Sequence, residues 1–334
     1  MKRTLIGAVL VAMTVLGTTA LAKEPKSKTP PARQAPNFDN VEIKVLPVRD
    51  NIYMLVGAGG NVTVQTGKDG VLVVDTEFAA VADKIVAAIH KLSDGPIRYI
   101  VNTHYHPDHV GGNEIIRKAG ATITGGNVAM DIADAAQGAQ VIAQDNVLQR
   151  MSMPQNGQPA APSGALPTST FFGDERKLYF NGEGIDIRHQ PAAHTDGDSI
   201  VFFRRSDVIS AGDLLLTDAY PYIDIAAGGT LNGYIDAVNR IADLIIPVYG
   251  QDGGTLVIPG HGRLCDLGDV LNYRDMLTIV RDRIQDMINK GMTLDQVKAA
   301  HPTVDYDPAY GSSTGFVTTE SFVEAAYKSL STKQ

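Results

Sequence analysis

The stretch 104-HYHPDH-109 holds three imidazoles and a carboxylate within six residues. The run before it, Ile97–Asn102, is rich in β-branched and aromatic residues, which predicts a buried strand ending where the stretch begins. Alternation along an extended chain would put His104, His106 and Asp108 on one side. Neutral imidazoles and a carboxylate suit zinc or another borderline divalent metal. Because one catalytic zinc usually takes three protein ligands, this concentration of ligands indicates two metals.

Three further ligand-type residues stand at predicted strand ends, each within three positions of a glycine: His194, Asp213 and His261. Taken singly, such a histidine is more often a surface or hydrogen-bonded core residue, and such an aspartate a turn residue or helix cap. The 104–109 stretch reverses that expectation for the whole set. Five of the eight histidines of the chain lie either in this stretch or at positions 194 and 261. The other three are expected to be structural or exposed: His90, His189 and His301.

Two groups of predicted strands alternate with helices along the chain. Strands are expected at 41–48, 52–56, 62–66, 71–75, 97–102, 121–124, 184–189, 200–204, 208–210 and 255–258. Helices are expected at 79–92, 114–119, 127–151, 231–245, 266–289, 293–300 and 318–330, with Thr230 as an N-cap. This order predicts an α/β (α+β) fold, a four-layer αββα sandwich of two mixed sheets covered by helices. The proline-rich loop within 152–170 is expected to be a flap or a surface insertion.

The first 22 residues have the form of a secretory signal peptide. Lys2 and Arg3 precede the apolar run 5–16, and Ala20-Leu21-Ala22 offers a small-x-small cleavage site. An uncleaved anchor is the alternative. Residues 23–40 are expected to form a flexible leader and residues 41–334 a single domain. We therefore expect a periplasmic protein that has no membrane contact after cleavage.

The charge and cysteine content of the chain limit the classes of molecule that it is expected to bind. The formal net charge is −8, and loss of Lys2 and Arg3 would bring it to about −10, so nucleic acid and anionic lipid are poor partners. The single cysteine, Cys265, excludes internal disulfides and is expected to be a small buried residue. A small-molecule substrate is the expected partner, and the sequence does not predict an oligomeric state.

The ligand-type residues, in this order and spacing, resemble the metallo-β-lactamase-fold hydrolase superfamily, in an exported β-lactamase-like or glyoxalase II-like branch. The resemblance runs from about Ile43 to His261 and includes the flanking segments 192–197 and 258–262. It implies the same αββα fold and a ligand set for two metals. That set places one metal on His104, His106 and His194, the second on Asp108, His109 and His261, and Asp213 between them.

Two zinc ions are the expected cofactors, with iron or manganese as other candidates. Zinc lowers the pKa of bound water from about 15.7 to about 7, which eases deprotonation by about 12 kcal/mol and supplies a hydroxide nucleophile at neutral pH. Asp108 is the expected catalytic residue, because a carboxylate there can orient the nucleophile and accept its proton.

Aspartate at position 213 differs from the best-known zinc β-lactamases, which carry cysteine or serine there, and matches glyoxalase II, lactonases and tRNA-processing nucleases. The signal peptide disfavours the cytosolic enzymes in that group, and the acidic charge disfavours RNA. The leading hypothesis is β-lactamase-like opening of a cyclic amide in the periplasm, a reaction of antibiotic resistance. The alternatives are a lactonase, esterase or phosphodiesterase on the same site, a mononuclear iron persulfide dioxygenase, and a non-catalytic metal-binding accessory protein.

Substrate contacts are predicted from loops near the ligands. Tyr220 and Tyr222 lie in the loop after Asp213, and Asn61 ends a glycine-rich turn that could overhang the site. Packing and turn roles are the alternatives for all three. Tyr105 is expected to face away from the metals and to pack.

Overall fold

The computed structural model describes residues 37–122, 138–154, 157, 159–245 and 253–332. Residues 37–334 cluster as one compact unit. The expected signal peptide and most of the expected leader lie in 1–36, outside the described residues. Within the described ranges, no helix has the length and apolar character needed to cross a bilayer.

The first sheet has seven strands arranged side by side in chain order. β1 to β4 form the antiparallel meander that the turns between them predict, and β4 to β7 run parallel. Parallel strands bring their carboxyl ends to one edge, so β5 delivers the 104–109 stretch to that edge. The strands are β1 (Lys44–Arg49), β2 (Ile52–Val56), β3 (Val62–Gln65), β4 (Val71–Val74), β5 (Ile97–Val101), β6 (Gln140–Gln144) and β7 (Ser169–Phe171).

The second sheet has five strands in the order β12-β11-β10-β9-β8. β8 to β11 pair antiparallel, and β11 and β12 pair parallel, so this sheet is mixed as well. The strands are β8 (Glu175–Phe180), β9 (Glu183–Gln190), β10 (Asp198–Phe203), β11 (Val208–Leu216) and β12 (Leu256–His261).

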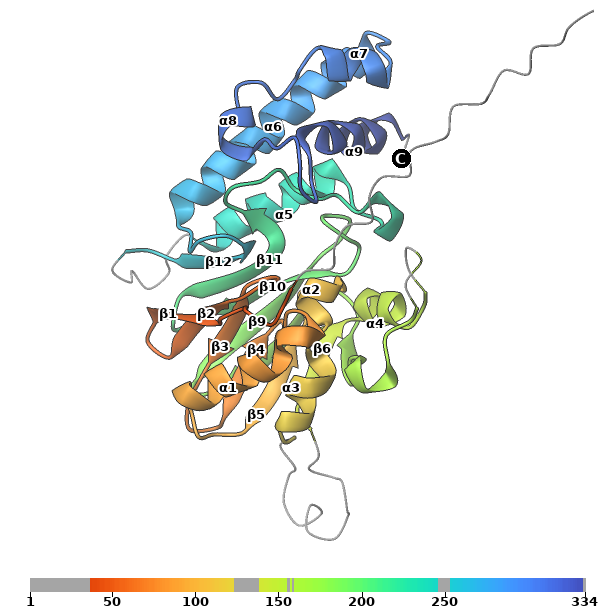
Figure 1. The fold of residues 1–334 in the computed structure, drawn as a ribbon. Helices are drawn as coiled ribbons and strands as arrows, with labels where there is room; N and C mark the ends of the chain where they lie inside the picture. The colour runs from red at the N-terminus through yellow and green to blue at the C-terminus, as the bar shows by residue number, and fades with distance from the viewer. Residues whose placement is uncertain (1–36, 123–137, 155–156, 158, 246–252, 333–334) are drawn as a thin grey trace, which may run out of the picture. The chain divides into compact units, whose positions relative to one another are not determined.

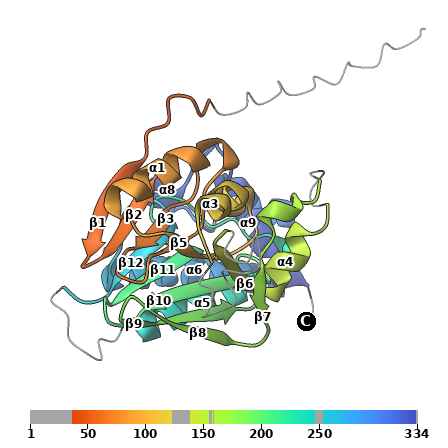
Figure 2. The ribbon, with the colours of Figure 1, turned by 90° about the horizontal axis from the view of Figure 1, so that it is seen from below.

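Helices cover the outer face of each sheet (Figure 1). α1 (Ala82–Leu92) and α3 (Asn113–Ala119) pack on the first sheet, and α5 (Leu231–Leu244) and α6 (Leu267–Asn289) pack on the second. A third apolar layer, which includes Val74 and Val201, lies between the sheets. The predicted αββα sandwich is therefore confirmed, because three buried cores separate four layers; Figure 2 shows the same layers from below.

The remaining helices are short or lie near the carboxyl end: η1 (Ala79–Val81), α2 (Pro107–Val110), α4 (Asp145–Met151), η3 (Ser163–Ala165), η4 (Ile225–Ala227), α7 (Leu294–Ala299), α8 (Asp307–Tyr310) and α9 (Thr319–Ser331). The predicted N-cap of α5 is confirmed, since Thr230 Oγ1 accepts a hydrogen bond from the Gly233 amide. α6 begins with a capping box formed by Asp266 and Asp269.

The helix predicted over 127–151 is confirmed only at its end, where 145–151 form α4, and is wrong over 140–144. Residues 127–137 lie outside the description, and 140–144 form β6, which is paired on both sides. The run Val141-Ile142-Ala143 is fully buried between neighbouring strands, and a short apolar run of this kind does not separate helix from strand by periodicity. The described end of the proline-rich loop is no free flap, because the Ala165 carbonyl accepts a hydrogen bond from Asn113 Nδ2 (2.9 Å).

Candidate metal centre

The structure brings all seven predicted ligand residues together at the edge where the parallel strands of the first sheet end. They form two groups in which one ligand atom per residue lies within 4.8 Å of the others. His104 and His106 follow β5, Asp108 and His109 lie on α2, His194 follows β9, Asp213 lies within β11, and His261 ends β12.

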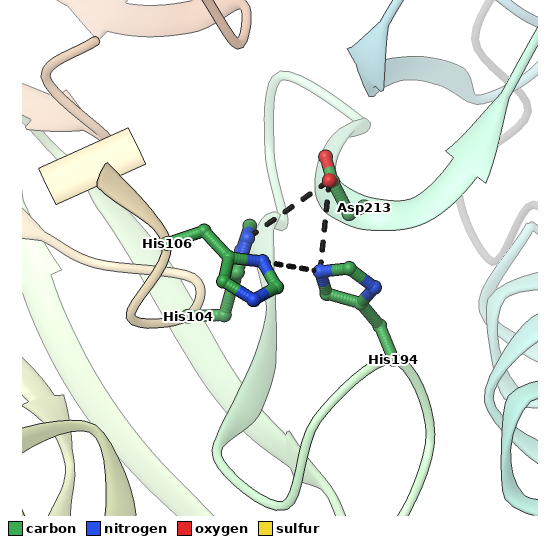
Figure 3. A group of neighbouring side chains, drawn as sticks. All are labelled: His104, His106, His194 and Asp213. Atoms are coloured by element: carbon green, nitrogen blue, oxygen red, sulfur yellow. Dashed lines mark hydrogen bonds and ion pairs between the residues drawn. The ribbon is translucent and has the colours of Figure 1, made fainter. Parts of the chain in front are cut away.

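The first group comprises three histidines and an aspartate whose side chains point toward one another (Figure 3). His106 Nδ1 lies 2.8 Å from His194 Nε2. Asp213 Oδ2 lies 3.6 Å from His194 Nε2 and 3.9 Å from His104 Nε2. Three nitrogens and one carboxylate oxygen thus converge on a single point, which is a donor set that borderline divalent metals accept.

The second group comprises Asp108, His109 and His261. His261 Nε2 lies 3.3 Å from Asp108 Oδ2 and 3.4 Å from His109 Nε2. Asp213 approaches this group with its other oxygen, because Oδ1 lies 3.1 Å from His109 Nε2 and 3.5 Å from His261 Nε2. One carboxylate therefore faces both groups, with one oxygen toward each.

Two glycines allow Asp213 to reach this position. Gly212 has φ +54° and lies in an irregular stretch of the β11 register, and a Cβ there would come 2.6 Å from Thr103 Oγ1. Gly260 leaves room for the carboxylate, since a Cβ there would lie 2.0 Å from Asp213 Oδ1. Asp213 thus lies inside a bulged strand, where the sequence predicted a strand end.

The alternation expected for the 104–109 stretch holds only as far as His106. Pro107 is the first residue of α2, a position that suits proline, and the chain turns there. Asp108 consequently leaves the face shared by His104 and His106, and joins His109 in the second group.

A buried carboxylate orients His109. Asp75 Oδ2 lies 2.8 Å from His109 Nδ1 and also accepts the Thr103 hydroxyl (2.7 Å), while Thr103 N donates to Asp75 Oδ1. Burial alone would lower the pKa of His109, but the carboxylates of Asp213 and Asp75 raise it well above its ordinary value. The hydrogen bond at Nδ1 leaves Nε2 directed at the centre.

Asp224 holds His106 in the same way, and the sequence analysis missed it. Its Oδ2 lies 3.1 Å from His106 Nε2 and accepts the hydroxyl of Tyr105 (2.5 Å). Burial would raise the pKa of Asp224, but the hydrogen bonds from His106 and Tyr105 bring it to about 2. Tyr105 is buried as expected, yet its hydroxyl serves the site indirectly, which corrects its expected role as a packing residue alone.

The donor atoms of the first group are available for a cation. Burial lowers the pKa of His104 well below its ordinary value and that of His194 to about 4, so both imidazoles are neutral near pH 7. His194 Nδ1 donates to the Tyr222 carbonyl (2.6 Å). Among the described residues, His104 Nε2 and Asp213 Oδ1 are buried without a hydrogen-bond partner. Buried polar atoms without partners are costly; a cation in the first group would satisfy His104 Nε2, and one in the second group would satisfy Asp213 Oδ1.

Comparison with known proteins agrees with this geometry. The family model of the metallo-beta-lactamase superfamily matches residues 55–261. The chain belongs to the metallo-beta-lactamase superfamily. The match covers every predicted ligand position, and the resemblance inferred from those residues is confirmed.

Several relatives lie at low identity. A linear primary-alkylsulfatase from Pseudomonas sp. (strain ATCC 19151) is 24% identical over 259 residues, 69% of this chain and 47% of that protein. The metallo-beta-lactamase type 2 of Bacillus cereus is 20% identical over 214 residues, 64% of this chain and 71% of that protein. This chain thus spans about half the length of the alkylsulfatase that it matches.

Solved structures show the same fold. A sec-alkylsulfatase from Pseudomonas sp. has a TM-score of 0.60 at 16% identity, covering 86% of this chain and 50% of its own. A metallo-beta-lactamase from Pontibacter korlensis has a TM-score of 0.53 at 15% identity, covering 71% of this chain and 99% of its own.

The three predicted substrate contacts have different outcomes. Asn61 is 4% exposed and donates both amide hydrogens to the carbonyls of Pro259 and Gly262 (2.9 and 3.1 Å), so it clamps the loop that carries His261. Tyr220 is 1% exposed and its hydroxyl donates to Asp307 Oδ1 (2.9 Å). Neither side chain is free for a substrate, which corrects both predictions.

The third predicted contact, Tyr222, lies beside the first group, with its ring 5.7 Å from that of His106 and 5.9 Å from that of His194.

Cys265 is buried, as expected, and burial raises the pKa of its thiol to about 12. His90 and His301 are exposed, and His189 faces the Asp196 carbonyl within the second sheet (2.8 Å), so none of these three histidines joins the centre.

Proposed function

We propose that the protein is a hydrolase with two divalent metal ions, most simply zinc, held by the seven residues of the centre. The observation that carries this proposal is the placement of Asp213, with Oδ2 toward the first group and Oδ1 toward the second. A single mononuclear site would leave the second group of three ligand-type side chains without a purpose.

The chain's own residues have distinct tasks in such a reaction. Metal ions in this position would lower the pKa of a bound water and polarise the bond to be cleaved. Asp108 would accept the proton of the attacking water. Burial raises its pKa, but the hydrogen bond to His261 and the nearby charge of His109 outweigh that effect and keep it ionised. Asp75 and Asp224 would hold His109 and His106 in the orientation that the reaction needs.

For the substrate we propose a small amide or ester, with the ring amide of a β-lactam as the first candidate. The relationship to the Bacillus cereus enzyme supports it. A sulfate ester is the second candidate, favoured because the alkylsulfatase aligns over 259 residues of this chain, more than the β-lactamase does. Aspartate at 213 weakens the case for the β-lactam, because the best-known zinc β-lactamases carry cysteine or serine there.

A hydrolysis panel on zinc-loaded protein tests this proposal. It should contain a chromogenic cephalosporin, a homoserine lactone, a phosphodiester and an alkyl sulfate. We expect turnover of at least one, about two metals per chain, and loss of turnover in His106→Ala. His90→Ala is the matched control, since His90 is exposed on α1. One iron per chain with no hydrolysis would favour the persulfide dioxygenase, and metal binding without any turnover would favour an accessory role.

We further propose that the protein acts in the periplasm on a small molecule, after cleavage near Ala22, without nucleic acid or membrane as partner. The charged start and the apolar run 5–16 support this localisation. Amino-terminal sequencing of the exported protein tests it, and a mature chain that retains Leu5 would contradict it.

A further inference from the structure

Phe316 is an exposed aromatic residue that lies close to the metal centre. Its side chain is 73% exposed, in the segment between α8 and α9. Its ring lies 5.0 Å from that of Tyr222, at 61°, and Tyr222 in turn contacts the rings of His106 and His194. Aromatic contacts therefore run without a break from the surface to the first group of ligands.

Hydrogen bonds and packing contacts hold Tyr222 and Phe316 in place. The Tyr222 carbonyl accepts the hydrogen bond from His194 Nδ1, which fixes its distance from the centre. The same loop is bound to the carboxyl-terminal segment, because Tyr220 N donates to the Tyr310 carbonyl (3.2 Å) and the Tyr220 ring stacks on Phe322 at 4.6 Å. Val317, next to Phe316, packs against the core of the second sheet. The positions of Phe316 and Tyr222 are thus coupled to the same core.

Nothing within the described part of the chain uses the outward surfaces of these side chains. The Tyr222 hydroxyl makes no hydrogen bond there, and most of the Phe316 side chain faces solvent. The superfamily match ends at His261, so Phe316 belongs to a part of the chain beyond the matched region. The rings of Phe316 and Tyr222 therefore offer solvent-facing apolar surface beside the metal centre, where a substrate substituent would cover it.

We propose that Phe316 and Tyr222 form an apolar wall at the mouth of the metal centre, which binds an alkyl or aryl substituent of the substrate. This inference rests on the proposed function and narrows its substrate class to amphiphilic molecules, in which an apolar substituent is attached to the group that is hydrolysed. Phe316 is the specificity-determining residue, because it supplies the larger exposed surface and touches no ligand residue itself.

Calorimetric titration of the zinc-loaded full chain with methyl-, propyl- and hexylphosphonate tests the wall. A phosphonate offers oxygen ligands to the metals and cannot be hydrolysed as an ester. If each added methylene buries about half of its surface, affinity should rise about 30-fold from methyl to hexyl. In Phe316→Ala the rise should fall below about 5-fold while methylphosphonate binding stays unchanged. Tyr222→Phe should keep the rise, since it keeps the ring.

Tyr179→Ala is the matched control, because Tyr179 is 78% exposed on β8 of the second sheet and makes no contact with the centre. It should behave as the wild type. Equal affinity of the wild type for all three phosphonates, or a full rise in Phe316→Ala, would overturn the wall alone. A wild type that binds none of them would overturn the metal centre itself, and with it this inference.

Discussion

Replacing Asp224 by asparagine tests how strongly a residue outside the ligand set controls the centre. Asp224 is 2% exposed, and one of its oxygens serves both His106 Nε2 and the Tyr105 hydroxyl. Asparagine keeps the shape but loses the charge that strengthens both hydrogen bonds. Loss of such support to a metal-binding histidine typically costs 10- to 100-fold in metal affinity, which is about 1.4 to 2.7 kcal/mol.

We therefore expect Asp224→Asn to weaken the first metal about 10- to 100-fold and to leave the second within about threefold. Competition with a chromophoric chelator measures both constants. Asp236→Asn is the control, because it makes the same charge change on an exposed position of α5. The reasoning is refuted if the first metal binds Asp224→Asn within about threefold of its affinity for the wild type.

In the metal-free protein, the effect of Asp224→Asn on the free energy of unfolding should depend on pH. The folded-state pKa of Asp224 is about 2, below its ordinary value of 3.8, so the ionised form stabilises the folded state. The contribution is about 2 kcal/mol, is fully present above about pH 4, and is lost as the pH falls through 2. The difference in unfolding free energy between wild type and Asp224→Asn should therefore shrink by about half between pH 6 and pH 3. Urea denaturation measures it, and a constant difference would contradict the hydrogen-bond network.

Three further outcomes are expected. His106→Ala should retain less than about a tenth of the hydrolytic rate; greater retention would mean that the site is misassigned. Asp213→Ala should bring metal content from about two ions per chain to one or fewer, as measured by mass spectrometry, and two tight ions would refute its bridging position. Asn61→Ala should leave two carbonyls of the His261 loop without donors and lower stability by about 1–3 kcal/mol, seen as a melting temperature reduced by several degrees.

The pKa values of the histidines differ between the two groups of the metal centre. In the first group His104 and His194 are neutral near pH 7, since burial lowers the pKa of both imidazoles. In the second group carboxylates outweigh burial: Asp213 and Asp75 raise the pKa of His109 well above its ordinary value, and Asp213 and Asp108 raise that of His261. A cation that binds His109 and His261 must therefore compete with protons more strongly than one that binds His104 and His194.

Local sequence was sufficient for the parts of this protein that depend on residue type and on position along a strand. The 104–109 stretch, together with His194, Asp213 and His261, has the donor chemistry of a metal centre, and all of these residues except Asp213 end or follow a strand. The antiparallel meander and the capped helix α5 likewise follow from short-range alternation and from Thr230.

Tertiary structure alone decided the features that depend on which segments meet. Buried apolar runs have the same composition in helices and strands, so only pairing with β5 and β7 defines β6. Asp224 orients His106, Asn61 clamps the His261 loop, and Phe316 reaches the mouth of the centre from beyond the superfamily match. No local pattern marks these three residues, because their roles come from contacts between segments far apart in the chain.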